Sequence, residues 1–452
     1  MTNSPLANSI SNLIERGEAI AAASLFANEH PADIAGALAV IARKNAHAAW
    51  GALELLPLAQ QAETFGYLDH ATQTSLAYAA PRAKLARIVT EMNADERADM
   101  FNELSDEQAE ALLPALAQAE REDIRRLAAY EDGTAGAIMT SDYATLPERL
   151  SAAEAIEKLR LEAPDKETIY RAYVTDAERK LIGAVRLQDL ILAPARAMVG
   201  DIMDRNTHAI SVHDDQEHAA RQIARYDVIA LPVVDDQKRI VGIVTHDDAM
   251  DVIQEEATED FHRVGTVSPL AANVRDAGIF LLYRARIVWL VVLVFGNIFS
   301  GAGIAAFEDT IAAYVALVFF LPLLIDSGGN AGSQSATLMV RALATGDVRM
   351  GDWGQMLGRE ALVAAMLGLS MAAAVSFIGV VRGGPEIALV VASAMVIIVI
   401  VGSLIGMTLP FVLTRFNLDP ATASAPLVTS IADAAGVIIY FAIATAFLPL
   451  PG

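Results

Sequence analysis

The 28 residues from Ile387 to Thr414 read IALVVASAMVIIVIVGSLIGMTLPFVLT and contain no charged side chain. About 20 consecutive apolar residues are enough for one helix to cross a bilayer. This stretch therefore predicts a transmembrane helix. The composition agrees, because 54% of the 452 residues are hydrophobic and the mean hydropathy is +0.38, which is too high for an ordinary soluble enzyme.

Similar apolar stretches lie on both sides of this one. They run from Ile287 to Ala306, from Ile311 to Val340, from Ala361 to Val381 and from Pro420 to Leu450, and only Asp326 and Asp433 interrupt them. Five membrane spans are thus expected, with lipid as a partner. Nearly all arginines of this region would lie on one side, which predicts a cytosolic N-terminal part and an outer C-terminus in the cell (inner) membrane. No signal peptide is expected, because the first 30 residues have no apolar core.

Charge is concentrated in the first 260 residues. Of the 33 basic and 55 acidic residues, 9 and 10 lie from Phe261 onward, so the net charge is −21 before this residue and −1 from it onward. The total of −22 argues against nucleic acid as a partner and favours cations. The absence of Cys excludes disulfides, zinc fingers and thiol catalysis. No nucleophile with a base and no phosphate loop is found, so an enzyme is not expected.

The acidic part divides near residue 130. Helical spacing predicts an all-α stack of short helices over 1–130, and alternating strands and helices are predicted after it. An internal repeat is carried by Val174, Asp176, Leu181, Gly183, Val185 and Asp189, which recur 59 residues later as Val233, Asp235, Ile240, Gly242, Val244 and Asp248. Units of about 60 residues are barely stable alone, so both copies should pack as one α/β module over 131–258.

These copies resemble cystathionine-β-synthase (CBS) domains, which pair as cytosolic regulatory modules. The segments YEDGTAGAIMT (130–140), PLLIDSGGNAGSQS (322–335) and DPATASAPLVTSIAD (419–433) further resemble the MgtE family of magnesium channels. The resemblance implies a multidomain fold: a helical superhelix domain, a tandem CBS pair, a connecting helix (259–284) and a five-span membrane domain (285–452). It also implies a homodimer whose pore runs between two membrane domains and is plugged by the connecting helix when cytosolic Mg²⁺ is bound.

Asp433 is the strongest candidate for a pore site. A carboxylate within an uncharged span is costly unless it meets water, a cation or a partner. The resemblance implies that it selects the ion, and two copies across a dimer axis would recognise hydrated Mg²⁺, which dehydrates reluctantly. Asn330 is a weaker candidate, expected at a break in the second span where irregular backbone can line a cavity. Ser424, Thr429 and Ser430 would add oxygens to this path or serve only helix packing.

An acidic run joins the CBS pair to the first span. Seven acids and no base lie between Asp247 and Asp260. Like charges along one helix repel, and hard divalent cations would relieve this, although a solvated helix face is the alternative explanation. The resemblance best supports six regulatory Mg²⁺ ligands, Asp227, Asp248, Asp251, Glu256, Glu259 and Asp260. Weaker candidates are Asp95, Asp99, Asp215 and Glu217.

The predicted function is a magnesium-selective, magnesium-gated channel or transporter. Two alternatives stay open: a CBS-regulated transporter of Mn²⁺, Co²⁺ or Ca²⁺, and a membrane Mg²⁺ sensor that passes no ions. A sensor needs no polar residue within the membrane, so Asp433 favours transport. A nucleotide such as ATP in the CBS cleft, held by Tyr170, Arg186 and Asp189, also stays open, because the sequence has no fingerprint for it.

Overall fold

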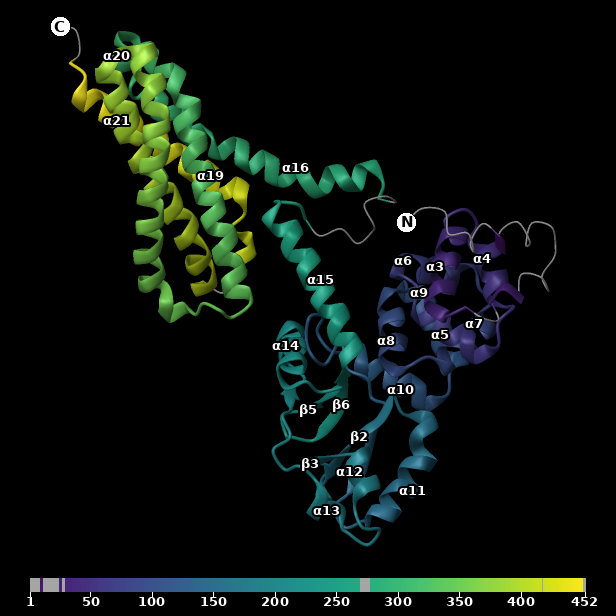
Figure 1. The fold of residues 1–452 in the computed structure, drawn as a ribbon. Helices are drawn as coiled ribbons and strands as arrows, with labels where there is room; N and C mark the ends of the chain where they lie inside the picture. Colours follow the sequence, from purple (N-terminus) through teal and green to yellow (C-terminus); the bar gives the residue numbers. More distant parts are fainter. Residues whose placement is uncertain (1–8, 11–23, 27–28, 269–276, 417, 450–452) are drawn as a thin grey trace. The chain divides into compact units, whose positions relative to one another are not determined.

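The computed structural model describes residues 9–10, 24–26, 29–268, 277–416 and 418–449. The chain forms two compact units, residues 1–255 and 256–452, and Figure 1 colours them along the sequence from purple to yellow. Each unit has hydrophobic cores of its own.

The N-terminal part of the first unit is a stack of short helices, as the sequence predicts. These helices are α3 (Pro31–Ala42), α4 (Ala46–Leu53), α5 (Leu58–Gly66), α6 (His70–Ala79), α7 (Arg82–Glu91), α8 (Ala94–Glu103), α9 (Asp106–Leu112) and α10 (Gln118–Leu127). Asn45 and Asp69 cap α4 and α6 by accepting hydrogen bonds from backbone N–H groups, which would otherwise have no partner at a helix start. Trp50 and Phe65 are buried in the core between the helices.

Two three-stranded sheets of the same topology follow. The first has the order β1 (Tyr143–Pro147), β2 (Thr168–Thr175), β3 (Leu181–Arg186), and the second has the order β4 (Ile210–Ser211), β5 (Ala230–Val234), β6 (Ile240–Thr245). The accompanying helices are α11 (Ala152–Glu162), α12 (Leu187–Leu192), α13 (Val199–Ile202) and α14 (Gln216–Tyr226). Val174 opposes Gly183 in the first sheet and Val233 opposes Gly242 in the second. The 59-residue repeat is therefore a structural repeat.

The two copies are intertwined. The backbone N–H of Thr140, which precedes the first sheet, donates to the carbonyl of Ile243 in β6 at 2.9 Å. The N–H of Ala184 in β3 donates to the carbonyl of Asp204, which precedes the second sheet, at 3.0 Å. Each copy thus lends its leading segment to the sheet of the other, which confirms that they pack as one module.

The acidic run lies on α15 (His246–Val264), which begins directly after β6. The helix ends because Gly265 follows it and Thr266 adopts a left-handed conformation with φ 54°. The next helix in the described residues begins at Ile279. The expected connecting segment 259–284 is thus not one continuous helix: its first residues finish α15, and its residues 269–276 lie outside the described residues.

The second unit is helical. Its helices are the end of α15, α16 (Ile279–Gly296), α17 (Ile298–Ala305), α18 (Glu308–Ala313), α19 (Ala316–Ala344), α20 (Trp353–Arg415) and α21 (Ala425–Phe447). Among the described residues, four helical segments are long and apolar enough to cross a membrane, namely Ile279–Ala305, Ala316–Ala344, Met350–Arg415 and Ala425–Phe447.

The third of these segments folds back on itself within α20. Gly384 has φ 82° and ψ 177°, which is not helical. A Cβ on Gly379 would lie 2.8 Å from the Cα of Ala388, so the two halves lie side by side (Figure 1). A straight helix of this length would be about three times as long as a bilayer is thick. The turn separates the two sequence stretches expected to be the third and fourth spans, and the count of five spans stays a prediction.

The glycine-rich segment of α19 is helical throughout, so the break expected near Asn330 is wrong. Gly328 and Gly332 instead pack against Gly402 and Gly406 of α20, and a Cβ on Gly402 would lie 2.3 Å from the carbonyl oxygen of Gly328. Small residues let two helices approach closely in a membrane. Continuous helix also keeps the backbone hydrogen bonds internal, which a bilayer requires.

Candidate metal sites and a nucleotide cleft

Carboxylates from three parts of the first unit meet near the start of α15. Asp95 and Glu96 lie in the first turn of α8, Glu167 precedes β2, and Asp248 lies in the first turn of α15. Asp95 is buried, with 8% of its surface exposed. Asn93 donates a side-chain N–H to Oε1 of Glu167 at 3.2 Å. We call Asp95, Glu96, Glu167 and Asp248 the acidic cluster.

Burial and mutual repulsion raise the pKa values of all four carboxyls. Burial raises the pKa of Glu96 to about 8, with Asp95 and Glu167 adding to the effect. Burial also raises the pKa of Glu167 to about 7, and Asp248 is the next largest cause. The pKa values of Asp95 and Asp248 are raised by burial first and then by neighbouring acids. The ionised cluster is therefore costly unless a proton or another cation is bound.

Two oxygens of the acidic cluster are left without a partner. Oδ1 of Asp95 and Oε2 of Glu167 are buried and accept no hydrogen bond from the described residues, which is unfavourable for charged groups. Mg²⁺ takes oxygen ligands and keeps several waters, so one or two carboxylates can hold it. Within the described residues, no group of three or more His, Asp or Glu side chains forms a ready-made metal cage. The cluster fits a hydrated ion that bridges α8 and the CBS pair.

A second electrostatic interaction between carboxylates involves Asp99, one turn further along α8. Burial raises the pKa of Asp99 to about 6; His70 opposes this shift, whereas Glu255 and Asp132 add to it. Glu255 lies on α15, seven residues after Asp248. The acids of α8 therefore interact with those of α15 at two positions: Asp95 with Asp248, and Asp99 with Glu255.

Three of the predicted ligands have other roles in the first unit. Asp215 caps α14 by accepting the backbone N–H of His218 at 3.0 Å, and Glu217 forms an ion pair with Arg221 of the same helix at 2.7 Å. Asp227 ends α14 with a left-handed φ of 51° and lines a separate cleft. The structure does not group these three with the acidic cluster.

Asp251 and Asp260 of α15 each interact with an acid four residues earlier on the same helix. Burial raises the pKa of Asp251, and Asp247 adds to this shift. In the second unit, burial raises the pKa of Asp260, with Glu256 adding and Arg263 opposing.

The guanidinium of Arg263 also binds carboxylates directly. It pairs with Glu259 on α15 and with Asp419, the residue before the 3₁₀ turn η4 (Pro420–Thr422). Glu259, predicted as a metal ligand, thus already has a cationic partner.

Polar groups of α19 and α21 face one another within the apolar helices. Asp433 is half-buried, and its Oδ1 has no hydrogen-bond partner among the described residues. A Cβ on Gly329 would lie 3.3 Å from that oxygen. Ser333 and Thr429 share a hydrogen bond of 3.0 Å. The side chain of Asp433 on α21 thus lies next to α19.

The other polar residues predicted along this path are more dispersed. Asn330 is exposed in the single chain and donates its side-chain N–H to Oδ2 of Asp326 at 3.2 Å. Ser424 lies at the start of α21, and its buried hydroxyl has no partner among the described residues.

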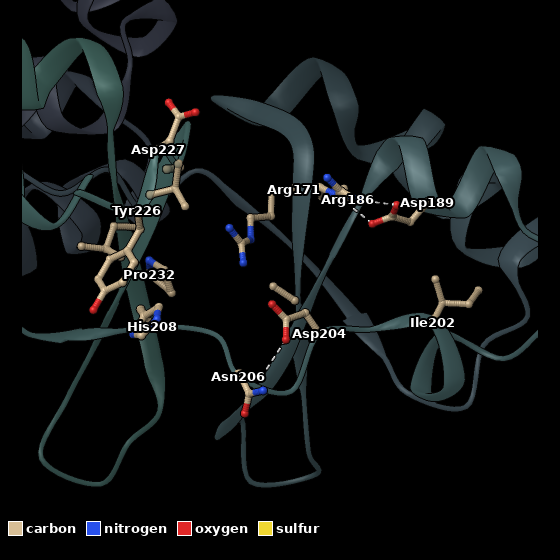
Figure 2. Close-up of a pocket in the computed structure, with 14 residues that line it drawn as sticks. Arg171, Arg186, Asp189, Ile202, Asp204, Asn206, His208, Tyr226, Asp227 and Pro232 are labelled. Atoms are coloured by element: carbon tan, nitrogen blue, oxygen red, sulfur yellow. Dashed lines mark hydrogen bonds and ion pairs between the residues drawn. The ribbon is translucent and has the colours of Figure 1, made fainter. Parts of the chain in front are cut away.

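A cleft of about 600 Å³ lies between the two CBS copies. Figure 2 shows Arg171 pointing into it and Arg186 paired with Asp189 at 2.8 Å. The Nε atom of Arg171 is buried without a partner in the described chain, so it can still donate to an anion. His208 stacks on Tyr226 with ring centroids 3.8 Å apart. These donors and flat rings suit a nucleotide.

Sequence reasoning placed two of its three nucleotide residues correctly in this cleft. Arg186 and Asp189 line it, whereas Tyr170 is 66% exposed and does not. Arg171 and His208 were missed, because neither stands in a recognisable motif.

Glu96 and Glu167 were missed as members of the acidic cluster, although the repeat held a signal for Glu167. By the 59-residue offset, Glu167 and Asp248 correspond to Tyr226 and Asp189, and both of these line the cleft. The acidic cluster therefore occupies the counterpart of the cleft in the other half of the CBS pair. Glu96 has no such counterpart in the sequence.

Comparison with known proteins covers all three parts of the chain. Residues 321–443 match a family model described as a divalent cation transporter, residues 29–133 match the MgtE intracellular N domain, and residues 135–196 and 199–255 match the CBS domain. The cytosolic domain of the Mg²⁺ channel MgtE, solved in complex with ATP, is 34% identical with a TM-score of 0.52, covering 54% of this chain and 99% of that chain. The soluble part of a magnesium transporter is 28% identical with a TM-score of 0.52, covering 56% of this chain and 98% of that one.

Full-length relatives extend the match into the membrane part. The magnesium transporter MgtE of Thermus thermophilus is 36% identical over 450 residues, 98% of both chains. MgtE of Bacillus subtilis is 30% identical over 391 residues, 85% of both chains. The N-terminal part is cytosolic and the helical C-terminal part spans the membrane. The chain thus belongs to the MgtE family of magnesium transporters.

Proposed function

We propose that two copies of this chain form a Mg²⁺ channel that conducts past Asp433 and closes when cytosolic Mg²⁺ binds the acidic cluster. The observation that carries the proposal is the pair of buried, unpartnered oxygens on Asp95 and Glu167, which come from the helical domain and the CBS pair. A cation between them would hold these parts together. The relatives of this chain are named magnesium transporters, which favours Mg²⁺ as that cation.

The gating step follows from electrostatics. We call the arrangement in which α8 lies against Glu167 and Asp248 the docked form. Without a cation, the pKa values of these acids are raised first by burial and then by mutual repulsion, and both effects on the ionised carboxylates favour release of α8. Bound Mg²⁺ stabilises the docked form by mass action. Because α15 carries Asp248 in its first turn and continues into the second unit, docking is proposed to act on the pore through this helix.

The conduction step is tested by uptake of Mg²⁺ into proteoliposomes. Asp433→Ala should leave a folded protein, because removing a costly charge from a span does not weaken the span, but uptake should be lost. Asp309→Ala, which removes an acid at the start of α18, is the matched control and should keep uptake. Wild-type rates in folded Asp433→Ala would refute the pore assignment.

The gating step is tested with Mg²⁺ on the cytosolic face. The double variant Asp95→Asn, Asp248→Asn should stay conductive at Mg²⁺ levels that close the wild type, because it removes one carboxylate of the acidic cluster from α8 and one from the CBS pair. Asp236→Asn, at a side chain that is 82% exposed, is the control and should close normally. Closure of the double variant at the same or a lower concentration would show that the cluster is not the sensor.

A dimer is required because one Asp433 provides too few ligands for a hydrated ion. Cross-linking or native mass measurements in detergent should find two chains. Uptake by single chains in liposomes would contradict this part of the proposal.

Uptake into proteoliposomes also distinguishes the alternative functions. Competition by Mn²⁺, Co²⁺ or Ca²⁺ at concentrations similar to that of Mg²⁺ would favour a broader divalent transporter. Absence of any ion flux, together with Mg²⁺-dependent docking, would favour a sensor.

A second proposed activity is the binding of ATP in the cleft between the CBS copies. The free donor of Arg171 and the Arg186–Asp189 pair support it, as does the related cytosolic domain solved in complex with ATP.

A further inference from the structure

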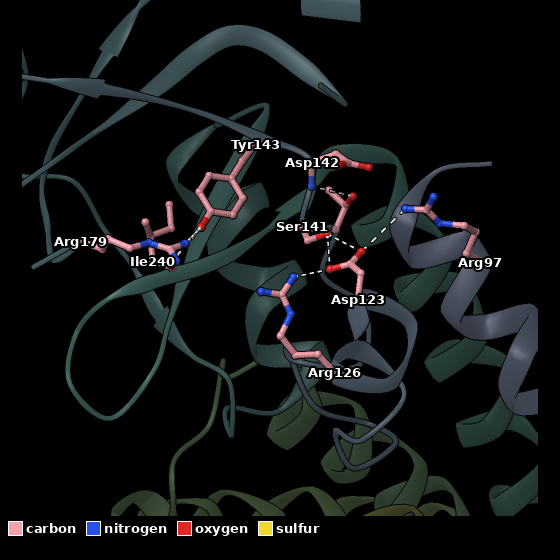
Figure 3. Close-up of polar contacts among 9 residues, drawn as sticks. Arg97, Asp123, Arg126, Ser141, Asp142, Tyr143, Arg179 and Ile240 are labelled. Atoms are coloured by element: carbon pink, nitrogen blue, oxygen red, sulfur yellow. Dashed lines mark hydrogen bonds and ion pairs between the residues drawn. The ribbon is translucent and has the colours of Figure 1, made fainter. Parts of the chain in front are cut away.

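The carboxylate of Asp123 on α10 connects the helical domain to the CBS pair. Figure 3 shows it between Ser141, Arg97 and Arg126. The hydroxyl of Ser141 donates to it and lies 3.0 Å from Oδ1 and 2.9 Å from Oδ2. Arg126 forms an ion pair with it, and Nη2 of Arg97 lies 3.7 Å from Oδ2. The side chains of Asp123 and Arg97 are only 20% and 10% exposed, so water screens these contacts weakly.

Arg97 ties this group to the helix that carries the acidic cluster. It lies on α8, one residue after Glu96 and two after Asp95. Successive helix positions point in different directions, and Arg97 contacts α10 whereas the two acids act on Glu167. On one side of α8, Arg97 therefore pairs with the oppositely charged Asp123. On another side, Asp95 and Glu96 face the like charge of Glu167.

Ser141 connects Asp123 to the part of the CBS pair that carries Asp248. Its neighbour Thr140 is joined to Ile243 of β6 by two backbone hydrogen bonds of 2.9 and 3.0 Å. Strand β6 ends at Thr245 and leads directly into α15, where Asp248 lies. A short, hydrogen-bonded path thus runs from Asp123 through Ser141 and β6 to the CBS side of the cluster.

We propose that Asp123 is a positioning residue whose bonds to Ser141 and Arg97 hold α8 on the CBS pair without metal and so set the Mg²⁺ concentration at which docking occurs. The proposal rests on the proposed gating function. Opposite charges and a hydrogen bond to a carboxylate offset part of the repulsion within the acidic cluster. Less Mg²⁺ is then needed to complete docking than if the ion alone joined the two parts.

The first test measures docking without metal. The chain has no Cys, so Tyr78→Cys and Leu161→Cys, at residues 63% and 72% exposed, give two specific spin-label sites in the full chain, one in the helical domain and one in the CBS pair. In EDTA, Ser141→Ala and Asp123→Asn should each lower the ratio of docked to released protein about tenfold, the usual effect of removing a hydrogen bond to a charged group. Ser141→Thr keeps the hydroxyl and should restore the ratio.

The second test titrates the same labelled proteins with MgCl₂. The midpoint of docking should rise several-fold in Ser141→Ala and Asp123→Asn, while the docked distance at saturating Mg²⁺ stays that of the wild type. Glu122→Gln is the control, because Glu122 lies on the same helix and accepts its hydrogen bond from Gln118 within α10. A role in stability alone would lower the melting temperature but leave the midpoint and the Ser141→Thr rescue unaffected.

The two tests separate the proposals. Unchanged ratios in EDTA together with unchanged Mg²⁺ midpoints overturn the role of Asp123. If the distance between the spin labels in the wild-type chain does not change with Mg²⁺, the proposed gating is refuted, and so is the role of Asp123 in setting the Mg²⁺ concentration. The comparison in EDTA then decides only whether Asp123 holds α8 on the CBS pair.

Discussion

Arg263 near the end of α15 forms an ion pair with Asp419 just before α21. The other carboxylate oxygen of Asp419 accepts the backbone N–H of Ala421 at 2.7 Å. Helix α15 begins beside Asp248 of the acidic cluster, and α21 carries Asp433. One ion pair thus connects the helix that bears the candidate sensor to the segment that leads into the candidate pore helix.

We expect this ion pair to transmit docking to the pore. Arg263→Gln and Asp419→Asn should each raise the Mg²⁺ concentration that half-closes the channel, by less than about fivefold, because partly exposed pairs contribute about 1 kcal/mol or less. The double variant should resemble Arg263→Gln, since that change already removes the pair with Asp419 as well as the pair with Glu259. Proteoliposome uptake measures this, with His262→Gln as the control. Additive effects of the two changes would mean that the pair does not act as a unit.

Without metal, the docked form should be favoured at about pH 6 over about pH 8. Released carboxyls have pKa values near 4, whereas in the docked form burial raises the pKa of Asp99 to about 6 and of Glu96 to about 8. The docked form therefore binds more protons. Docking is most favourable below about pH 4 and weakens as the pH rises through these docked values. The spin-label distance in EDTA measures it.

With Mg²⁺ present the pH dependence should have the opposite sign. Mg²⁺ must displace the protons that the docked carboxyls hold, so the Mg²⁺ midpoint should fall as the pH rises from about 6 to about 8. The double variant Asp95→Asn, Asp248→Asn should depend less on pH than the wild type in EDTA, while Glu96, Glu167 and Asp99 still titrate. A midpoint that rises with pH would contradict competition between protons and Mg²⁺.

The close contact of α19 and α20 should not tolerate a methyl group at Gly402. A Cβ there would lie 2.3 Å from the carbonyl oxygen of Gly328, whereas a Cβ on Gly358 of the same helix has open space. Gly402→Ala should destabilise the membrane unit by about 1–3 kcal/mol or more, the cost of overpacking. Gly358→Ala should be neutral or slightly stabilising, because Ala is the better helix former. Thermal unfolding in detergent compares them, and equal stability would refute the close packing.

ATP binding should depend on the cleft arginines. Arg171→Gln and Arg186→Gln should each weaken ATP binding to the full chain by about tenfold or more, because each removes a charged donor to an anion. Arg160→Gln, an exposed arginine paired with Glu157 on α11, is the control and should bind normally. Isothermal titration calorimetry gives the affinities. Unchanged affinity in both cleft variants would place the nucleotide elsewhere or argue against its binding.

Several features of this protein follow from local sequence patterns. The absence of charge over Ile387 to Thr414 and the 59-residue repeat depend on neighbouring residues or on a fixed offset, so they can be read without knowing the fold. Asp433 stands out for the same reason, as a single acid in an apolar stretch. The helical domain, the CBS module and the apolar helices were therefore predictable.

The sites that join distant segments were decided by the tertiary structure. Asp95 and Asp248 are 153 positions apart in the chain, and Glu167 reaches them only because the two copies exchange their leading segments. Arg263 meets Asp419, and the glycines of α19 meet α20, through packing that no local pattern encodes. The helical Asn330 segment shows the same limit: its glycines suggested a break, but the close approach of a second helix is what they serve. Sequence periodicity reports which face of an element is apolar, whereas the choice of partner depends on how all the faces fit together.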